Sequence, residues 1–422
     1  MIKLAWRNIW RNRRRAIITM ASVFFAVLFS VLMNSFSTGV WDKMIDNTLR
    51  TQTGHIQIHA GGYWDDKVID NFMFMDAATI SQLENISGIS NVSPRVETFA
   101  MAASSAVSKG IALIGVSPEK EAEKSNLPSR LVSGAYLSET DDGILIGEGV
   151  SKYLKVTVGD TLALIGQGYH GSSAAGLFPI RGILKLMTAE MDNSMAYVTL
   201  PAAQNFIDMP DGYSGILISI SDNKRLDEIM EVVSCQLSVI SDENTGNYQL
   251  ETENWKLETD NYAVYSWHFT MERLLQQAES DKAFSKVLMF ILYVIVGFGI
   301  LGTVIMMTNE RKREFSMMIS LGMSRMKLMT TTAFELLVMS LIGVILGLGV
   351  TLPVAHWFNT HPIQVTGEMA TTFIEFGMEP VMPMSVEPAI FTNQITTVLV
   401  IVAMTVIYPM RKILKLKISD NK

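Results

Sequence analysis

Four long apolar runs constrain this sequence more than any other feature. Residues 16–40 form 25 consecutive positions without a charge, and residues 287–308 form 22 more. Residues 329–358 contain a single acid, Glu335, and a fourth run covers residues 389–409. A helix of about 20 apolar residues crosses the ~30 Å hydrocarbon core of a bilayer. The pattern therefore predicts an α-helical membrane protein with four transmembrane helices, arranged as one plus three around a large insert.

Basic residues lie on alternate flanks of these runs. The two terminal segments and the connection between runs two and three together hold 16 basic and three acidic residues, whereas residues 41–283 hold 17 basic and 33 acidic. Residues 359–388 contain four acids and neither Lys nor Arg. Because basic flanks resist translocation, we expect both termini and the middle loop in the cytoplasm and the insert outside. The first run is too long for a cleaved signal peptide.

Composition excludes several other classes of protein. The single cysteine, Cys235, excludes a disulfide framework and a cysteine-based zinc site. A net charge of −7 argues against a nucleic-acid partner. Within the chain we expect no metal, no cofactor and no catalytic residue.

The segment borders follow from the apolar runs and the charges between them, with Pro409 expected at the end of the last helix. The expected segments are a cytosolic amphipathic helix (1–15), transmembrane helix 1 (16–40), an extracytoplasmic α/β domain with stalk helices (41–283), transmembrane helix 2 (284–308), a cytosolic coupling segment (309–328), transmembrane helix 3 (329–358), an extracytoplasmic loop (359–388), transmembrane helix 4 (389–410) and a cytosolic tail (411–422).

The insert is predicted to fold as a mixed α/β domain. Alternating or β-rich runs at residues 55–59, 144–146, 161–165 and 216–220 are typical of strands. The last of these leads into a predicted helix, residues 224–237. Its apolar stripe is Leu226, Ile229, Val232 and Val233. We expect Cys235 to be a buried thiol in this helix.

Two short patterns in the insert suggest chemistry that their surroundings do not support. Residues 166–171 match the G-x-G-x-x-G dinucleotide fingerprint, but a strand-like stretch follows instead of a helix, which favours a glycine loop between two strands. His55 and His59 lie on one strand face, and no further metal ligand is identifiable, so we expect satisfied or surface histidines. The chain has no G-x-x-x-x-G-K-[ST] motif for nucleotide hydrolysis.

The third apolar run contains three residues with a candidate role in helix packing or gating. An acid inside a membrane is costly and usually has a partner or a function. Glu335 either pairs with a basic residue of the preceding loop and orders the helix end, or takes part in coupling. Gly343 and Gly347 have the small-xxx-small spacing that lets two helices approach closely.

The cytosolic side contains two amphipathic segments. Residues 1–15 interleave aromatic and basic side chains and are expected to lie on the membrane surface. The anchoring residues are Trp6, Arg7, Trp10, Arg11 and Arg14. In residues 310–327, charged residues precede Phe315, Met318 and further apolar positions at helical spacing, with Gly322 as the expected stop. This segment is either a helix that docks on another protein or an ordinary loop helix.

At this segment the sequence resembles the FtsX-like permeases of MacB and of lipoprotein-releasing LolC/LolE ABC transporters. Residues 309–324, "NERKREFSMMISLGMS", are similar to the coupling segment of that family, and residues 4–15, "LAWRNIWRNRRR", to its opening. Residues 144–164 resemble a recurrent stretch of its external domain, Trp267 a tryptophan before the stalk, and residues 408–417 its tail.

The resemblance implies a MacB-like periplasmic core domain and a permease subunit that couples ATP hydrolysis on a separate LolD-like ATPase dimer to motion of that domain. It also implies a bacterial inner-membrane location, a second permease copy or paralogue, ATP and Mg on the ATPase, contact with membrane lipid, and a periplasmic lipoprotein carrier or adaptor. The residues it assigns to ATPase coupling are Glu310, Arg311, Arg313, Glu314, Phe315, Met318 and Gly322.

Three functions are compatible with this interpretation of the sequence. The short segment before the first apolar run favours the LolC/LolE layout, and thus lipoprotein release, over a fused ATPase of the MacB kind. A MacB-like efflux permease working with an adaptor and an outer-membrane channel is the second possibility. A membrane sensor or regulator without transport is the third.

Overall fold

A computed structural model describes residues 10, 13–105, 107–240, 256–258, 261–375 and 380–415. The chain divides into two compact units. One, the helical unit, contains residues Met1–Lys43, Gln277–Gln364 and Val381–Lys422, and the other, the sheet unit, contains Met44–Gln276 and Val365–Pro380. Three of the residues expected to anchor the N-terminal segment, Trp6, Arg7 and Arg11, lie outside the described residues.

Four helices in the described residues are long and apolar enough to cross a membrane: Arg13–Thr53, Glu272–Glu310, Arg325–Thr360 and Pro388–Leu414. The first consists of α2 (Arg13–Thr48) and a π-helical end, η1 (Leu49–Thr53). The others are α10 (Glu272–Glu310), α12 (Arg325–Thr360) and α14 (Pro388–Leu414), and the short α11 (Lys312–Ser320) lies between α10 and α12 in the chain.

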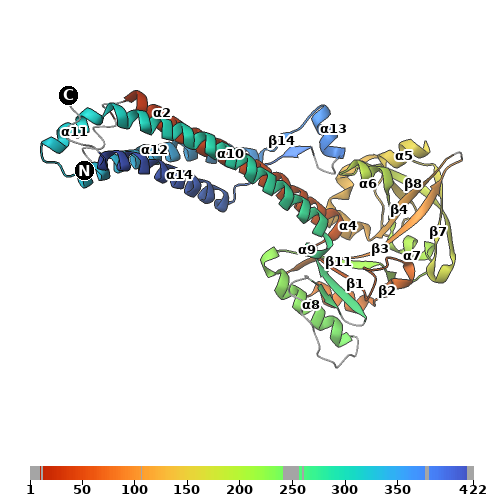
Figure 1. Cartoon of the computed structure of the whole chain (residues 1–422). Helices are drawn as coiled ribbons and strands as arrows, with labels where there is room; N and C mark the ends of the chain where they lie inside the picture. Colours follow the sequence, from red (N-terminus) through yellow and green to blue (C-terminus); the bar gives the residue numbers. More distant parts are fainter. Residues whose placement is uncertain are drawn as a thin grey trace. The chain divides into compact units, whose positions relative to one another are not determined.

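The helical unit is held together by an apolar core and by polar contacts at the helix ends. Valines and alanines of α2 pack with residues of α10, α12 and α14. Helices α2 and α10 lie side by side (Figure 1). Their contacts include the Arg15–Glu310 ion pair at one end and a 2.9 Å hydrogen bond from Trp41 Nε1 to Asp281 at the other. A short hairpin pairs β14 (Ile363–Gln364) with β15 (Val381–Met382).

Pro409 is not at a helix end, so that expectation was wrong. Helix α14 continues through it to Leu414. In a bundle of apolar helices, neighbouring helices and local adjustment can satisfy the backbone groups that an internal proline frees. Pro353 likewise lies inside α12.

The sheet unit is built on a mixed sheet with the strand order β12-β13-β1-β11-β3-β4-β9-β6-β8-β5, in which β7 pairs with β3 and β8. The strands are β1 (Ile56–Ala60), β3 (Ile89–Ala103), β4 (Ser108–Val116), β5 (Leu131–Gly134), β6 (Ile144–Gly147), β7 (Thr161–Gln167), β8 (Ser173–Leu184), β9 (Met195–Thr199), β11 (Gly215–Ile220), β12 (Lys256–Glu258) and β13 (Tyr262–Ser266). A separate pair joins β2 (Met73–Phe74) and β10 (Gly212–Tyr213).

Strand β3 connects two hydrophobic cores of the sheet unit. Val92, near its beginning, packs with β1, β11 and the helices α3 (Ala77–Glu84) and α8 (Leu226–Ile240). Val96 and Ala100, further along, pack with β4, β6, β7, β8 and β9. The remaining helices of this unit are α4 (Pro118–Ser125), α5 (Glu148–Leu154), α6 (Ala189–Ser194), α7 (Leu200–Phe206), α9 (Trp267–Thr270) and α13 (Glu368–Glu375).

Several local predictions for the insert are confirmed and two are wrong. The four predicted strands correspond to β1, β6, β7 and β11, and the glycine-rich residues 168–172 join β7 to β8 as a hairpin. Cys235 is exposed instead of buried, and so is Val232. The buried face of α8 contains Ile229, Val233 and Leu237, four residues apart, and Cys235 lies outside this stripe.

Candidate functional site

Helix α11 (Lys312–Ser320) ends at a defined capping structure. At its C-terminus, the Met323 N–H donates to the Met318 carbonyl and the Gly322 N–H to the Ile319 carbonyl, both at 3.0 Å. These two bonds form a Schellman motif, which places a residue in the left-handed region. Gly322 has φ = +92°, so its role as the helix stop, predicted from sequence, is confirmed.

The apolar face of α11 is covered by the protein's own helices. Phe315 is 2% exposed and packs with Leu328, Met329 and Ile413, and Met318 is packed against the same cluster. The outer face is different, because Met317 is 58% and Leu321 81% exposed. Arg313 is also exposed. Among the residues that the resemblance assigns to coupling, Arg311 and Phe315 are buried, whereas Glu310, Arg313 and Gly322 are exposed. Met317 and Leu321 were not among them.

Arg311 connects the end of α10 to α11 and α12. Its Nη1 atom donates to both carboxylate oxygens of Glu335, at 3.0 and 2.7 Å, and both side chains are buried. Its Nε atom donates to Glu314 at 3.4 Å, and its guanidinium lies over the Phe315 ring at 5.4 Å from the centroid. Glu335 thus has the loop-side basic partner that sequence reasoning offered as one of two alternatives.

Two glycines of α12 allow close approach to α2. A Cβ on Gly343 would lie 2.8 Å from the Met20 carbonyl oxygen and 2.9 Å from Val23 Cβ. A Cβ on Gly347 would lie 3.0 Å from Val27 Cβ. Both positions therefore lie at close contacts between α2 and α12, and the small-xxx-small spacing is typical of such contacts. Of the residues expected to anchor the membrane surface, Trp10 and Arg14 are described, and both are exposed.

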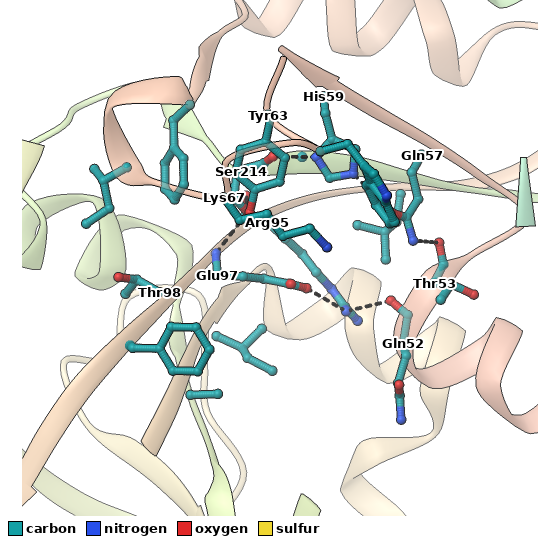
Figure 2. Close-up of a pocket in the computed structure, with 18 of the residues that line it drawn as sticks. Gln52, Thr53, Gln57, His59, Tyr63, Lys67, Arg95, Glu97, Thr98 and Ser214 are labelled. Carbon is teal, nitrogen blue, oxygen red and sulfur yellow. Dashed lines mark hydrogen bonds and ion pairs between the residues drawn. The ribbon is translucent and has the colours of Figure 1, made fainter. Parts of the chain in front are cut away.

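The sheet unit contains a pocket of about 500 Å³ (Figure 2). It is lined by β1, by the segment that follows β1, by β3 and by β11. His59 on β1 is buried, and its ring nitrogens bond the Ser214 carbonyl at 2.6 Å and Gln57 Oε1 at 2.9 Å. Burial lowers the pKa of His59 to about 4. A neutral imidazole has one N–H, so it donates to one of these two oxygens. His59 is therefore a buried core histidine, and among the described residues no group of His, Cys, Asp and Glu could hold a metal ion.

Arg95 lies on the pocket wall and binds the end of η1. Its Nη1 donates to the Gln52 carbonyl and its Nη2 to the Thr51 carbonyl, each at 3.1 Å. Nη2 also contacts both carboxylate oxygens of Glu121 on α4, at 2.8 and 2.9 Å. Burial acts to raise the pKa of Glu121, but Arg95 and Lys124 together hold it below its ordinary value. A cation at a helix C-terminus also interacts favourably with the helix dipole.

Sequence reasoning missed this buried charge cluster. Helix α4 has the sequence "PEKEAEKS", which reads as an exposed polar helix, yet Glu121 and Lys124 are both buried. On β3, Arg95 and Glu97 stand two residues apart, and this spacing puts both side chains on one face of the strand. That spacing was the only available signal, and it does not say which face is buried.

Comparisons with known proteins identify related families. Residues 16–234 match the family model for the MacB-like periplasmic core domain, and residues 286–418 match that for the FtsX-like permease C-terminal region. The lipoprotein-releasing system transmembrane protein LolC of Neisseria meningitidis is 20% identical over 324 residues, covering 74% of this chain and 71% of that protein. LolE of Haemophilus influenzae is 18% identical over 331 residues, covering 76% and 73%.

A solved structure also matches part of the chain at low similarity. The periplasmic region of MacB from Actinobacillus actinomycetemcomitans is 14% identical, with a TM-score of 0.38, and the match covers 56% of this chain and 98% of that one.

The two family matches define the class: this is a membrane-spanning permease component of an ABC transporter. The chain belongs to the family of FtsX-like permeases with a MacB-like periplasmic core domain, of the FtsX/MacB/LolC type, as its sequence motifs predict. It is an inner-membrane protein with a periplasmic domain, and its family implies an ABC ATPase as partner.

Proposed function

We propose that this permease couples ATP hydrolysis on a separate, LolD-like ATPase dimer to movement of its periplasmic unit, and that it releases lipoproteins from the inner membrane. In this proposal both termini and α11 are cytoplasmic, the ATPase holds ATP and Mg, and a second permease copy or paralogue completes the assembly. A periplasmic carrier or adaptor receives the released lipoprotein.

The observation that carries this proposal is the division of α11 into two faces. Phe315 and Arg311 join the helix to α12, so a force on α11 reaches the membrane helices through packed side chains and a buried ion pair. Met317 and Leu321 are apolar, exposed and flanked by basic residues. An apolar pair surrounded by polar side chains is typical of an anchor in a protein interface.

Lipoproteins are the proposed cargo because the two curated relatives, LolC and LolE, are named for lipoprotein release. Both alignments cover more than 70% of each chain, so each is longer than the periplasmic region alone. ATP-dependent release of a lipidated protein from proteoliposomes, with its unlipidated form as control, tests this part. Release that is absent while ATPase activity is coupled to the permease would contradict it.

The docking surface is tested by co-purification of the ATPase with the full-length permease. Met317→Asp and Leu321→Asp place a charge in the proposed interface, and we expect each to weaken ATPase binding by about tenfold or more. Val232→Asp, at an exposed apolar position on α8, is the control. Phe315→Asp is a poor test, because it would also disrupt the packing of α11. Full ATPase retention by the Leu321 and Met317 variants would refute this surface.

A further inference from the structure

The pocket of the sheet unit has the size and composition of a small-molecule site. Its volume of about 500 Å³ falls within the ~300–1,000 Å³ usual for such sites. Buried polar side chains on its walls are already held in place, with Gln57, His59 and Ser214 bonded to one another or to backbone. Walls that keep their geometry without a ligand lose little entropy when one binds.

Two opposite charges, Lys67 and Glu97, line this pocket without forming a direct ion pair, although Glu97 favours the charged form of Lys67. The Lys67 ammonium lies 3.8 Å from the centroid of the Trp64 ring and forms no ion pair with any described residue. The Glu97 side chain is 49% exposed, and its ion-pair contact in the described structure is a long one, 3.5 Å from Arg95 Nη1. Arg95 is itself neutralised by Glu121. Lys67 and Glu97 are therefore the two charges that a ligand would meet.

Apolar surface continues from these charges. Phe72 lines the pocket and contacts Tyr63 edge-on, with ring centroids 5.9 Å apart. Phe99 also lines it and is 80% exposed, two residues beyond Glu97 on the same face of β3. A molecule held by the two charges would therefore have an aromatic surface beside it for an apolar group.

We propose that this pocket binds a small zwitterion with an apolar body, of the size of an amino acid or a dipeptide. Its carboxylate pairs with Lys67, its ammonium with Glu97, and its apolar side chain packs on Phe72 and Phe99. A ligand with only one charge would bring that charge beside the like-charged pocket residue, and unpaired charges in a partly desolvated site are costly. This inference is independent of the coupling proposal, because it concerns the sheet unit alone.

The test compares three probes with the same aromatic body: phenylalanine, 3-phenylpropanoate and 2-phenylethylammonium. Binding to the full-length protein in lipid nanodiscs is measured by titration calorimetry, with empty nanodiscs as the blank. We expect saturable binding of phenylalanine, and binding at least about tenfold weaker for each singly charged analogue. Absence of saturable binding by both phenylalanine and leucyl-phenylalanine overturns the proposal. This outcome does not depend on whether an ATPase binds the permease.

Variants separate this site from adventitious binding. Lys67→Met should weaken phenylalanine binding about tenfold, and 2-phenylethylammonium should bind this variant equally well or more tightly. Glu97→Gln should likewise weaken phenylalanine binding about tenfold, and 3-phenylpropanoate should bind it equally well or more tightly. Lys109→Met is the matched control, since Lys109 also lies over an aromatic ring, that of Tyr153, outside the pocket. Thermal melts establish that each variant is folded. Unchanged phenylalanine affinity in folded Lys67 and Glu97 variants refutes the assignment.

Discussion

Replacing Lys124 by methionine should stabilise the sheet unit at neutral pH. Lys124 Nζ is buried and has no hydrogen-bond partner among the described residues. The neighbouring carboxylate of Glu121 is occupied by Arg95, which is also positively charged. Burial, reinforced by Arg95, lowers the pKa of Lys124 from 10.5 to about 7. The folded chain therefore holds this proton much more weakly than the unfolded chain.

The size of the effect follows from that difference in pKa. Between pH 7 and 10.5 the unfolded chain binds one more proton than the folded chain at this site, so stability rises with pH, by about 1.4 kcal/mol per pH unit. With half-protonation near pH 7, the rise from pH 7 to pH 9 is about 2 kcal/mol. Lys124→Met removes this slope, and at pH 7 it should add about 3 kcal/mol because a long apolar side chain replaces a buried ammonium.

Pulse proteolysis of the full-length protein in detergent, over a urea series at pH 7 and pH 9, measures the effect on the sheet unit. Lys120→Met is the control on the same helix, because the Lys120 ammonium pairs with Glu84 and is partly exposed. This variant should keep the wild-type pH slope. An unchanged slope in Lys124→Met, or a loss of stability at pH 7, would show that the buried ammonium is not destabilising.

Three further perturbations test other parts of the structure. Glu335→Gln leaves Arg311 buried beside a neutral amide and should cost about 3–5 kcal/mol, seen as a lower melting temperature in detergent, with Glu314→Gln as the milder control. Gly343→Ala should also lower the melting temperature, because its Cβ would meet the backbone of α2, whereas Gly349→Ala, in open space on the same helix, should not. For His59, with its pKa lowered to about 4, stability should fall as the pH drops from 6.5 to 4, by about 3 kcal/mol in total, and His59→Gln should abolish this loss. Equal melting of the two alanine variants, an unaffected Glu335→Gln, or a flat acid profile would contradict these assignments.

The sequence predicted the helical unit better than the sheet unit because the two depend on different signals. A run such as residues 16–40 is apolar over its whole length, so a helix there follows from local composition alone. The Schellman stop at Gly322 is also local, since a glycine after an apolar stripe ends a helix by its backbone freedom. The membrane borders of the four helices and the orientation of the chain were inferred from charged residues flanking the apolar runs, and they stay predictions.

The sheet unit depends on pairings between distant residues. Strand β7 was visible as a β-rich run, but its pairing with both β3 and β8 could not be read from one sequence. The same limit applies to side chains. In α8 the apolar spacing allowed more than one face to be the buried one, and the choice of Val232 and Cys235 was wrong because Met230 and Leu237 meet the core instead. The burial of Lys124 could not be predicted from the sequence, because it arises only when the chain folds.

The buried cluster around Arg95 has a mechanical consequence for any motion of α2. At the π-helical end of that helix, the carbonyls of Thr51 and Gln52 accept hydrogen bonds from the Arg95 guanidinium, which is itself paired with Glu121. Arg95 belongs to β3, the strand that contributes to both hydrophobic cores of the sheet unit. A displacement of η1 must therefore move β3 with it or break several charge-assisted hydrogen bonds in a buried site, and the second is the more costly. The connection between η1 and the sheet is consequently rigid. A displacement of η1 is transmitted to the pocket by Arg95, which lines it.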